Sequence, residues 1–212
     1  MAKSGSAEIL WRAARTLRPA RARGKALPRL LFFTDPARVA SPEAVIAALP
    51  RGAGVVYRAF AAPDALAKGR SLAQLARRRG LVFLVGADPG LASRLMADGV
   101  HLPERTLARA RGLRRERPRW LVTGAAHSAA ALALARRAGL DAVALSPAFA
   151  SRSPSAAKPL GVLRFAQLVG GARRPVYALG GIRADNARRL VRPGVAGLAA
   201  VEALAQSASP RT

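Results

Sequence analysis

Eight short apolar runs recur along the chain, each about as long as a β-strand and each followed by a turn signal. Val, Leu and Ala follow one another in them without regular alternation with polar residues, as in strands of a parallel sheet covered on both faces. The runs are Leu30–Phe33, Gly54–Arg58, Leu81–Val85, Gly99–Leu102, Trp120–Thr123, Ala142–Leu145, Val176–Leu179 and Gly197–Ala200.

Segments of helical periodicity follow these runs, with apolar residues three to four positions apart. They are Ser41–Leu49, Ser71–Arg79, Gly90–Ala97, Glu104–Arg111, Ser128–Ala138, Val162–Val169, Arg183–Leu190 and Val201–Ser207. A strand regularly followed by a helix is the repeating unit of a (β/α)8 barrel, so we predict an α/β protein with a single TIM barrel. A doubly wound open sheet is the alternative, because the sequence does not show the order of the strands.

The barrel is expected to form one domain, because no linker divides the chain within it. We assign residues 29–212 to this domain and residues 1–28 to a short basic N-terminal extension. The extension has two interpretations. It is either an amphipathic helix over Ala7–Arg18 that caps the bottom of the barrel, or a disordered basic tail.

The formal net charge of +25 raises the question of a nucleic-acid partner. Only four of the 36 basic residues are lysines, and the arginines are spread over almost every predicted helix. This distribution is typical of solvated helix faces, so nucleic-acid binding is not expected and is kept as the weakest alternative. The absence of cysteine excludes disulfides, thiolate metal sites and a cysteine nucleophile.

Arginines interrupt every hydrophobic stretch, so no apolar run reaches the roughly 18 residues that a membrane span needs. The first residues also lack the continuous apolar core of a secretory signal. We therefore expect a cytoplasmic protein with no membrane partner.

The residues after the predicted strands are polar, glycine-rich or titratable. A TIM barrel places its active site at the carboxyl ends of its strands, so these residues are candidates for chemistry. They are Thr34-Asp35, Arg58, Gly86-Ala87-Asp88, Pro103-Glu104, Ala126-His127-Ser128, Ser146-Pro147, Gly180-Gly181 and Val201-Glu202. His101 lies inside a strand and is predicted to be buried and hydrogen-bonded.

A series of short segments in this order resembles thiamine phosphate synthases and TenI proteins. The segments are LFFTD, VVYR, ADGVHL, AHSAAAL, AGLDAVALSPAF, KPLG, YALGGI and GVAGLAAVEAL, between Leu30 and Leu204. The resemblance implies one of two reactions. The synthases join a hydroxymethylpyrimidine diphosphate to a thiazole phosphate with Mg²⁺, whereas TenI relatives tautomerise a thiazole carboxylate phosphate.

The resemblance also implies a phosphate site in the loops after the last two strands. Glycine lets the backbone approach an anion and donate N–H groups to it. Glu202 stands where the family has a serine, which puts a carboxylate near the phosphate. The resemblance also implies that a forked guanidinium at the end of the second strand binds the ligand. Hydroxyls and a cation on the loop after the sixth strand are expected to close over it. The residues expected to bind substrate or phosphate are Arg58, Ser151, Ser153, Lys158, Gly180, Gly181, Val201 and Glu202.

His127 matches the histidine that is the proposed proton shuttle of TenI-like tautomerases, and is our candidate catalytic residue. The family's two metal-binding aspartates align with Ala87 and Thr106, which are not anionic. Asp88 and Glu104 stand nearby and are the candidate metal ligands. Mg²⁺ is therefore expected as a cofactor only if synthase activity is retained.

We predict a TenI-like enzyme of thiamine metabolism that acts on a thiazole-phosphate-type ligand. The first alternative is a thiamine phosphate synthase, and the second is a catalytically degenerate barrel that binds a small phosphorylated ligand. In each case the partner is a phosphorylated thiazole or pyrimidine. The oligomeric state is left open, a homo-oligomer included.

Overall fold

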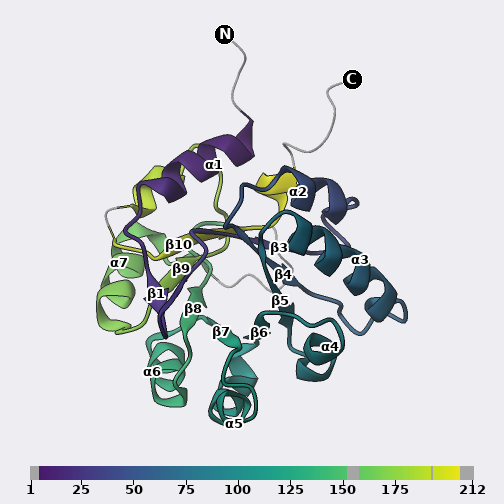
Figure 1. Cartoon of the computed structure of the whole chain (residues 1–212). Coiled ribbons are helices and arrows are strands. Elements are labelled where there is room, and N and C mark those ends of the chain that lie inside the picture. The colour runs from purple at the N-terminus through teal and green to yellow at the C-terminus, as the bar shows by residue number, and fades with distance from the viewer. Residues whose placement is uncertain (1–4, 152–157, 192, 206–212) are drawn as a thin grey trace.

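The computed structural model describes residues 5–151, 158–191 and 193–205. Eight parallel strands close into a barrel in the order β10-β3-β4-β5-β6-β7-β8-β9, with helices around the outside (Figure 1). The closed ring confirms the predicted TIM barrel and excludes the open sheet. Its strands are β3 (Leu30–Phe33), β4 (Gly54–Tyr57), β5 (Val82–Gly86), β6 (Gly99–Leu102), β7 (Leu121–Ala126), β8 (Ala142–Leu145), β9 (Val176–Ala178) and β10 (Gly197–Ala200).

All eight predicted strands are present, and four of them, β3, β6, β8 and β10, have the predicted bounds. The helices of the barrel are α2 (Pro42–Ala48), α3 (Ala65–Arg78), α4 (Pro89–Arg94), α5 (Ala110–Glu116), α6 (Ala129–Ala138), α7 (Gly161–Gly171) and α8 (Glu202–Ala205), with the 3-10 turns η1 (Glu104–Arg109) and η2 (Ala187–Leu190).

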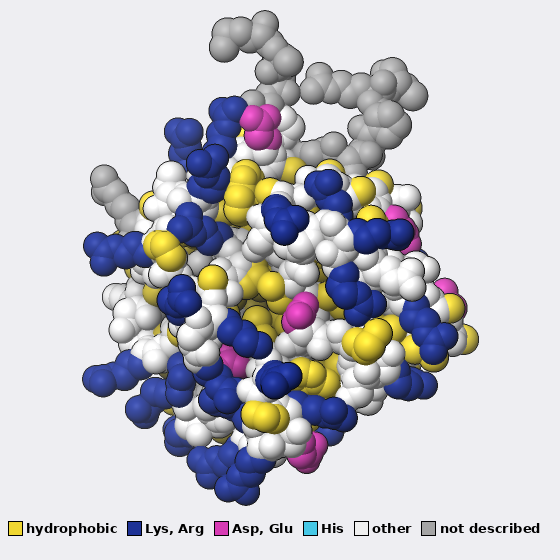
Figure 2. All heavy atoms as spheres, viewed as in Figure 1, with side chains coloured by type: hydrophobic (Ala, Val, Ile, Leu, Met, Phe, Trp, Pro, Cys, Tyr) yellow, Lys and Arg dark blue, Asp and Glu magenta, His cyan; other side chains and the backbone are white. Residues whose placement is uncertain are grey.

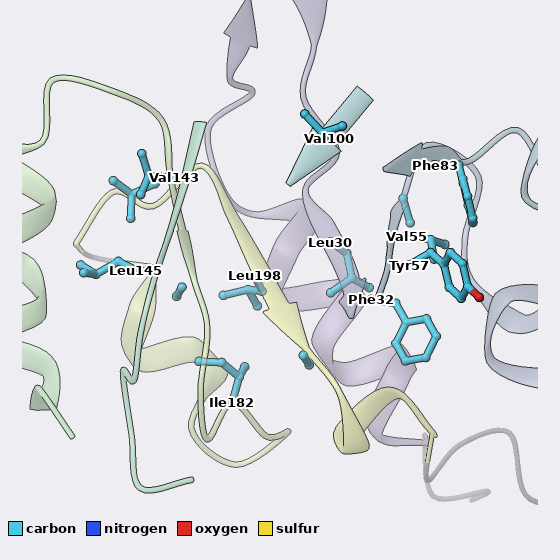
Figure 3. Close-up of a cluster of buried hydrophobic side chains, with 14 of the residues drawn as sticks. Leu30, Phe32, Val55, Tyr57, Phe83, Val100, Val143, Leu145, Ile182 and Leu198 are labelled. Atoms are coloured by element: carbon cyan, nitrogen blue, oxygen red, sulfur yellow. The ribbon is translucent and has the colours of Figure 1, made fainter. Parts of the chain in front are cut away.

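Apolar side chains fill both faces of the barrel wall, which is why the strands read as continuous apolar runs. Leu31, Phe33, Val56, Leu84 and Tyr177 belong to the inner cluster. The outer cluster lies between the strands and the helices. Figure 3 shows part of it, with Leu30, Phe32, Val55, Tyr57, Phe83, Val100, Val143, Leu145, Ile182 and Leu198.

The N-terminal extension packs against the barrel. Its helix α1 (Ser6–Arg15) has Leu10 and Ala14 fully buried and contacts α8, β10 and β3. A two-stranded hairpin follows, formed by β1 (Arg21–Ala22) and β2 (Lys25–Ala26). The extension is helical, as one of its two interpretations expects. The helix belongs to the outer cluster and packs beside α8, however, and does not cap the bottom of the barrel.

Two predicted helices are wrong. The segment Glu104–Arg111 consists mostly of the 3-10 turn η1, and α5 begins only at Ala110. The spacing over Arg183–Leu190 predicts an α-helix, but the structure has only the short turn η2 there. The Asn186 side chain accepts a hydrogen bond from Arg183 N at 2.9 Å and donates one to Gly181 O at 2.8 Å. These side-chain bonds take the place of helical backbone bonds, and they leave no α-helix N-terminus behind Gly181.

The basic residues are spread over the face of the molecule seen in Figure 2. On the face seen in Figure 2, Lys and Arg side chains alternate with hydrophobic and uncharged ones over the whole outline and form no single stripe. In the part of the chain that the structure describes, no helix combines the length and apolar character that a membrane crossing requires.

Candidate functional site

A cavity of about 1660 Å³ opens at the carboxyl ends of the barrel strands. Side chains alternate between the two faces of a strand, so Phe33, Arg58 and His101 project toward the barrel interior and line this cavity. The loops that follow the strands form its rim. The cavity therefore has the position that a TIM barrel uses for its active site.

Arg58 is held on the cavity wall by the end of β3. Its Nε donates to Thr34 O at 2.7 Å and its Nη2 to Asp35 Oδ2 at 3.2 Å, while the Thr34 hydroxyl accepts from Arg58 N at 2.9 Å. Burial lowers the pKa of Arg58 to about 10, and Asp35 opposes that shift. Arg58 thus remains cationic at neutral pH, and its Nη1 has no acceptor among the described residues and can serve a ligand.

Two aromatic rings flank the Arg58 guanidinium. Its carbon lies 5.7 Å from the centre of the Phe33 ring and 5.2 Å from that of Phe60. The Phe60 side chain is 62% exposed, and both Phe60 and Ala61 have left-handed backbone angles, with φ of 48° and 58°. Such strain in a non-glycine residue costs about 1–3 kcal/mol, which the surroundings must offset.

His101 lies at the floor of the cavity and is 7% exposed, as the sequence predicts for a buried, hydrogen-bonded residue. The Thr123 hydroxyl donates to Val100 O at 3.3 Å, so it accepts from His101 Nδ1 at 2.9 Å. The proton then sits on Nδ1, and Nε2 is an acceptor. Burial lowers the pKa of His101 to about 3, helped by the positive charge of Arg58, so the ring is neutral.

The neutral ring makes stability depend on pH. Above an unfolded pKa of 6.5 both states are neutral; as the pH falls toward 3, only the unfolded state gains the proton. We therefore expect His101 to lower the free energy of unfolding by about 1.4 kcal/mol per pH unit in that window. Urea unfolding at pH 7, 6 and 5 tests this against His101→Gln, whose loss on acidification should be smaller. Parallel losses in the two proteins would contradict it.

His127 lies on the rim after β7 and is held from two sides. Its backbone N donates to Glu104 Oε2 at 2.8 Å. Its Nδ1 lies 2.9 Å from Ser146 O, which can only accept, so Nδ1 carries the proton. In the neutral ring Nε2 is then a free base at a cavity-lining residue, the arrangement that a proton shuttle needs.

Gly180 and Gly181 line the cavity after β9, both with left-handed backbone angles (φ 89° and 65°). Neither N–H group has a hydrogen-bond acceptor among the described residues, so both can serve an anion. The pair also supports the neighbouring loop. A Cβ on Gly181 would lie 2.3 Å from Ala150 O, and one on Gly180 would lie 2.8 Å from Pro147 Cα.

The remaining predicted phosphate ligands differ in their positions. Val201, Glu202 and Ser151 line the cavity, whereas Lys158 is exposed and does not. Ser153 lies outside the described residues. The Glu202 carboxylate is 3.8 Å from Arg38 Nη1, and this ion pair reduces its repulsion of a phosphate.

The two candidate metal ligands serve other contacts. Asp88 Oδ1 accepts from Leu91 N at 2.8 Å and caps α4, and Glu104 accepts from His127 N. The Thr106 hydroxyl donates to Pro103 O at 3.1 Å. Among the residues that the structure describes, no three or more acidic or histidine side chains gather. Mg²⁺ can also be held by one or two carboxylates together with substrate oxygens. Because Ala87 and Thr106 supply no carboxylate, and Asp88 and Glu104 are engaged with backbone N–H groups, the residues present do not fit the Mg²⁺ site that the resemblance implies.

Several arginines line the cavity although the sequence does not single them out. Their spread over the predicted helices is typical of solvated faces, yet five of them line the cavity together with Arg58: Arg38, Arg94, Arg105, Arg109 and Arg183. The only signal in the sequence that could have identified them is that each follows the end of a predicted strand by a few residues.

Comparisons with known proteins identify one family. Residues 30–204 match the family described as thiamine monophosphate synthase. The thiamine-phosphate synthase of Synechococcus sp. (strain WH7803) is 31% identical over 189 residues, covering 86% of this chain but only 54% of that protein. The chain thus spans about half the length of this relative. The putative thiamine-phosphate synthase 2 of Aquifex aeolicus is 31% identical, covering 60% of this chain and 68% of that protein.

A solved structure shows the same fold. The thiamine phosphate pyrophosphorylase of Pyrococcus furiosus superposes with a TM-score of 0.72 at 24% identity, covering 85% of this chain and 91% of that one.

Proposed function

This chain belongs to the thiamine monophosphate synthase family, and from that premise we propose that its cavity binds a thiazole phosphate and a pyrimidine diphosphate and joins them as thiamine phosphate. The observation that carries the proposal is the large cationic cavity at the strand ends, within the residues that match the family. Relatives named thiamine-phosphate synthase support the coupling reaction rather than another use of the fold.

The thiazole phosphate is assigned to the loop of Gly180 and Gly181. Their two N–H groups, which have no acceptor among the described residues, can donate to phosphate oxygens and need no particular side chain to do so. Ser151 lines the cavity nearby, and the pairing of Glu202 with Arg38 limits the repulsion expected from a carboxylate at this point. These contacts support binding of a singly phosphorylated ligand on the β9 and β10 side.

The coupling reaction requires positive charge close to the departing diphosphate. A C–N bond forms to the pyrimidine methylene carbon while its C–O bond to the diphosphate breaks, so negative charge grows on the leaving diphosphate. Since the described residues do not fit Mg²⁺, this charge falls to protein cations. Arg58, held rigidly by Thr34 and Asp35, is one such cation at the cavity wall.

The direct test is formation of thiamine phosphate by the purified chain from the two substrates. We expect product, and we expect EDTA to change its rate by less than about threefold, because Ala87 and Thr106 supply no carboxylate to a metal at the positions that the resemblance implies. A rate that EDTA abolishes would contradict the metal-free assignment. Absence of product at saturating substrates would contradict the coupling function.

A second candidate is tautomerisation of a thiazole carboxylate phosphate, the TenI-like reaction. His127 favours it: Nδ1 is fixed by Ser146 O, and the free Nε2 can take a proton from carbon and return it at another position. This reaction creates no leaving group and needs no metal. Incubating the chain with the thiazole alone and following its isomerisation separates this candidate from the synthase.

A further inference from the structure

The rim of the cavity has a large excess of positive charge. Among the described residues that line it, the only acidic ones are Asp88 and Glu202. Six arginines line the same cavity: Arg38, Arg58, Arg94, Arg105, Arg109 and Arg183. Such an excess around a concave surface raises the local concentration of anions and disfavours a divalent cation.

The arginines fall into two groups according to their partners. Arg38 and Arg58 share the Asp35 carboxylate, at 2.7 and 3.2 Å. Arg183 pairs with Asp185, with its Nε 3.4 Å from Asp185 Oδ1. The second group, which we call the arginine triad, is made up of Arg94, Arg105 and Arg109. The guanidinium groups of the triad have no hydrogen bond or ion pair to any residue that the structure describes.

Two carboxylates close to the triad in the sequence form no ion pair with it. Asp88 stands at the start of α4 and uses Oδ1 to cap that helix through Leu91 N. Glu104 precedes the two arginines of η1 and accepts from His127 N. All three guanidinium groups of the triad therefore keep their donors for a ligand.

The triad occupies one side of the barrel mouth. Its α4 and η1 follow the neighbouring strands β5 and β6, whereas Gly180 and Gly181 follow β9. In the closed order of strands, β5 and β6 stand opposite β9 and β10, as Figure 1 shows. Two separate anion sites thus face each other across one cavity, one built from backbone N–H groups and one from guanidinium groups.

The two sites suit different anions. Two N–H groups match one phosphate, whereas three guanidinium forks provide charge and paired donors for a more highly charged group. We propose that Arg94, Arg105 and Arg109 bind the diphosphate of the second substrate directly, without a divalent cation. This assignment rests on the proposed function, and it names the residues that take the charge of the leaving group.

Titration calorimetry with inorganic diphosphate tests the proposal, at about 150 mM salt to screen weak surface binding. We expect the wild type to bind equally well in EDTA and in excess Mg²⁺. The double variant Arg105→Gln/Arg109→Gln should bind at least about tenfold more weakly, because two charge-assisted contacts are lost.

A matched control removes the same charge elsewhere. Arg78 on α3 and Arg164 on α7 are exposed and do not line the cavity. The variant Arg78→Gln/Arg164→Gln should bind diphosphate within about twofold of the wild type. An equal loss in both double variants would overturn the proposal in favour of general attraction to a polycation. Binding that requires Mg²⁺, or that the triad variant leaves unchanged, would also overturn it.

The coupling assay separates this proposal from the proposed function. Metal-free diphosphate binding that depends on the triad, in a chain that forms no thiamine phosphate, would support the site and contradict the reaction. Formation of thiamine phosphate together with Mg²⁺-dependent diphosphate binding would support the reaction and contradict the proposed site.

Discussion

His127→Asn is expected to slow isomerisation of a thiazole carboxylate phosphate by about 10²–10⁴-fold, the usual contribution of a positioned general base. Asparagine can still donate from its amide to Ser146 O, but it has no basic nitrogen in place of Nε2. Formation of thiamine phosphate should change far less, because that reaction depends on cations around the diphosphate. Both reactions are measured on the same preparation.

Thermal unfolding is the control for this variant, since His127 is largely exposed and the amide preserves its main contact. The melting temperature should stay near that of the wild type. Isomerisation that survives in His127→Asn would assign the proton transfer to another group. An equal loss of both reactions would indicate that His127 positions the substrates rather than moving a proton.

Gly181→Ala is expected to destabilise the fold by about 2–5 kcal/mol, a large share of the stability of a typical domain. The left-handed backbone of Gly181 (φ 65°) costs any other residue about 1–2 kcal/mol. The added methyl group would also lie 2.3 Å from Ala150 O and 2.8 Å from Phe149 O, so the loop after β8 must move. Chemical denaturation measures the change.

Gly170→Ala provides the matched control. Gly170 lies in α7 without a left-handed backbone, and a methyl group added there would meet nothing within 4 Å. Alanine at this position should be neutral or should stabilise by up to about 1 kcal/mol, because it favours the helix. If Gly181→Ala unfolds like the wild type, the close approach of this turn to Ala150 is not a constraint on the fold.

The residues around the cavity differ from the metal-binding pattern that the resemblance implies. Ala87 and Thr106 lack the carboxylates that the resemblance implies for the metal, and Asp88 and Glu104 accept hydrogen bonds from backbone N–H groups. A chain that retains the cavity but not the metal ligands must either leave the coupling reaction or stabilise the diphosphate with other charges. The arginines around the mouth are consistent with the second course.

The sequence was sufficient for the architecture. Strands such as Leu30–Phe33 and Ala142–Leu145 have the predicted bounds, because periodicity and turn signals are local properties and a parallel strand buried on both faces is apolar throughout. The same regularity predicted which end of the barrel holds the cavity, since the polar residues follow the strands. Where a side chain competes with the backbone, as Asn186 does, periodicity failed and a predicted helix became a turn.

The chemistry of individual side chains depended on neighbours that are distant in the sequence. His101 is neutral because burial in the barrel and the positive charge of Arg58 lower its pKa, and Arg58 is held by Thr34 and Asp35, which follow β3. Composition cannot separate Arg105 from Arg78, since both are exposed helical arginines. Closure of the barrel does separate them: it turns one toward the cavity and the other toward solvent, because a closed ring of parallel strands brings all strand ends to one mouth.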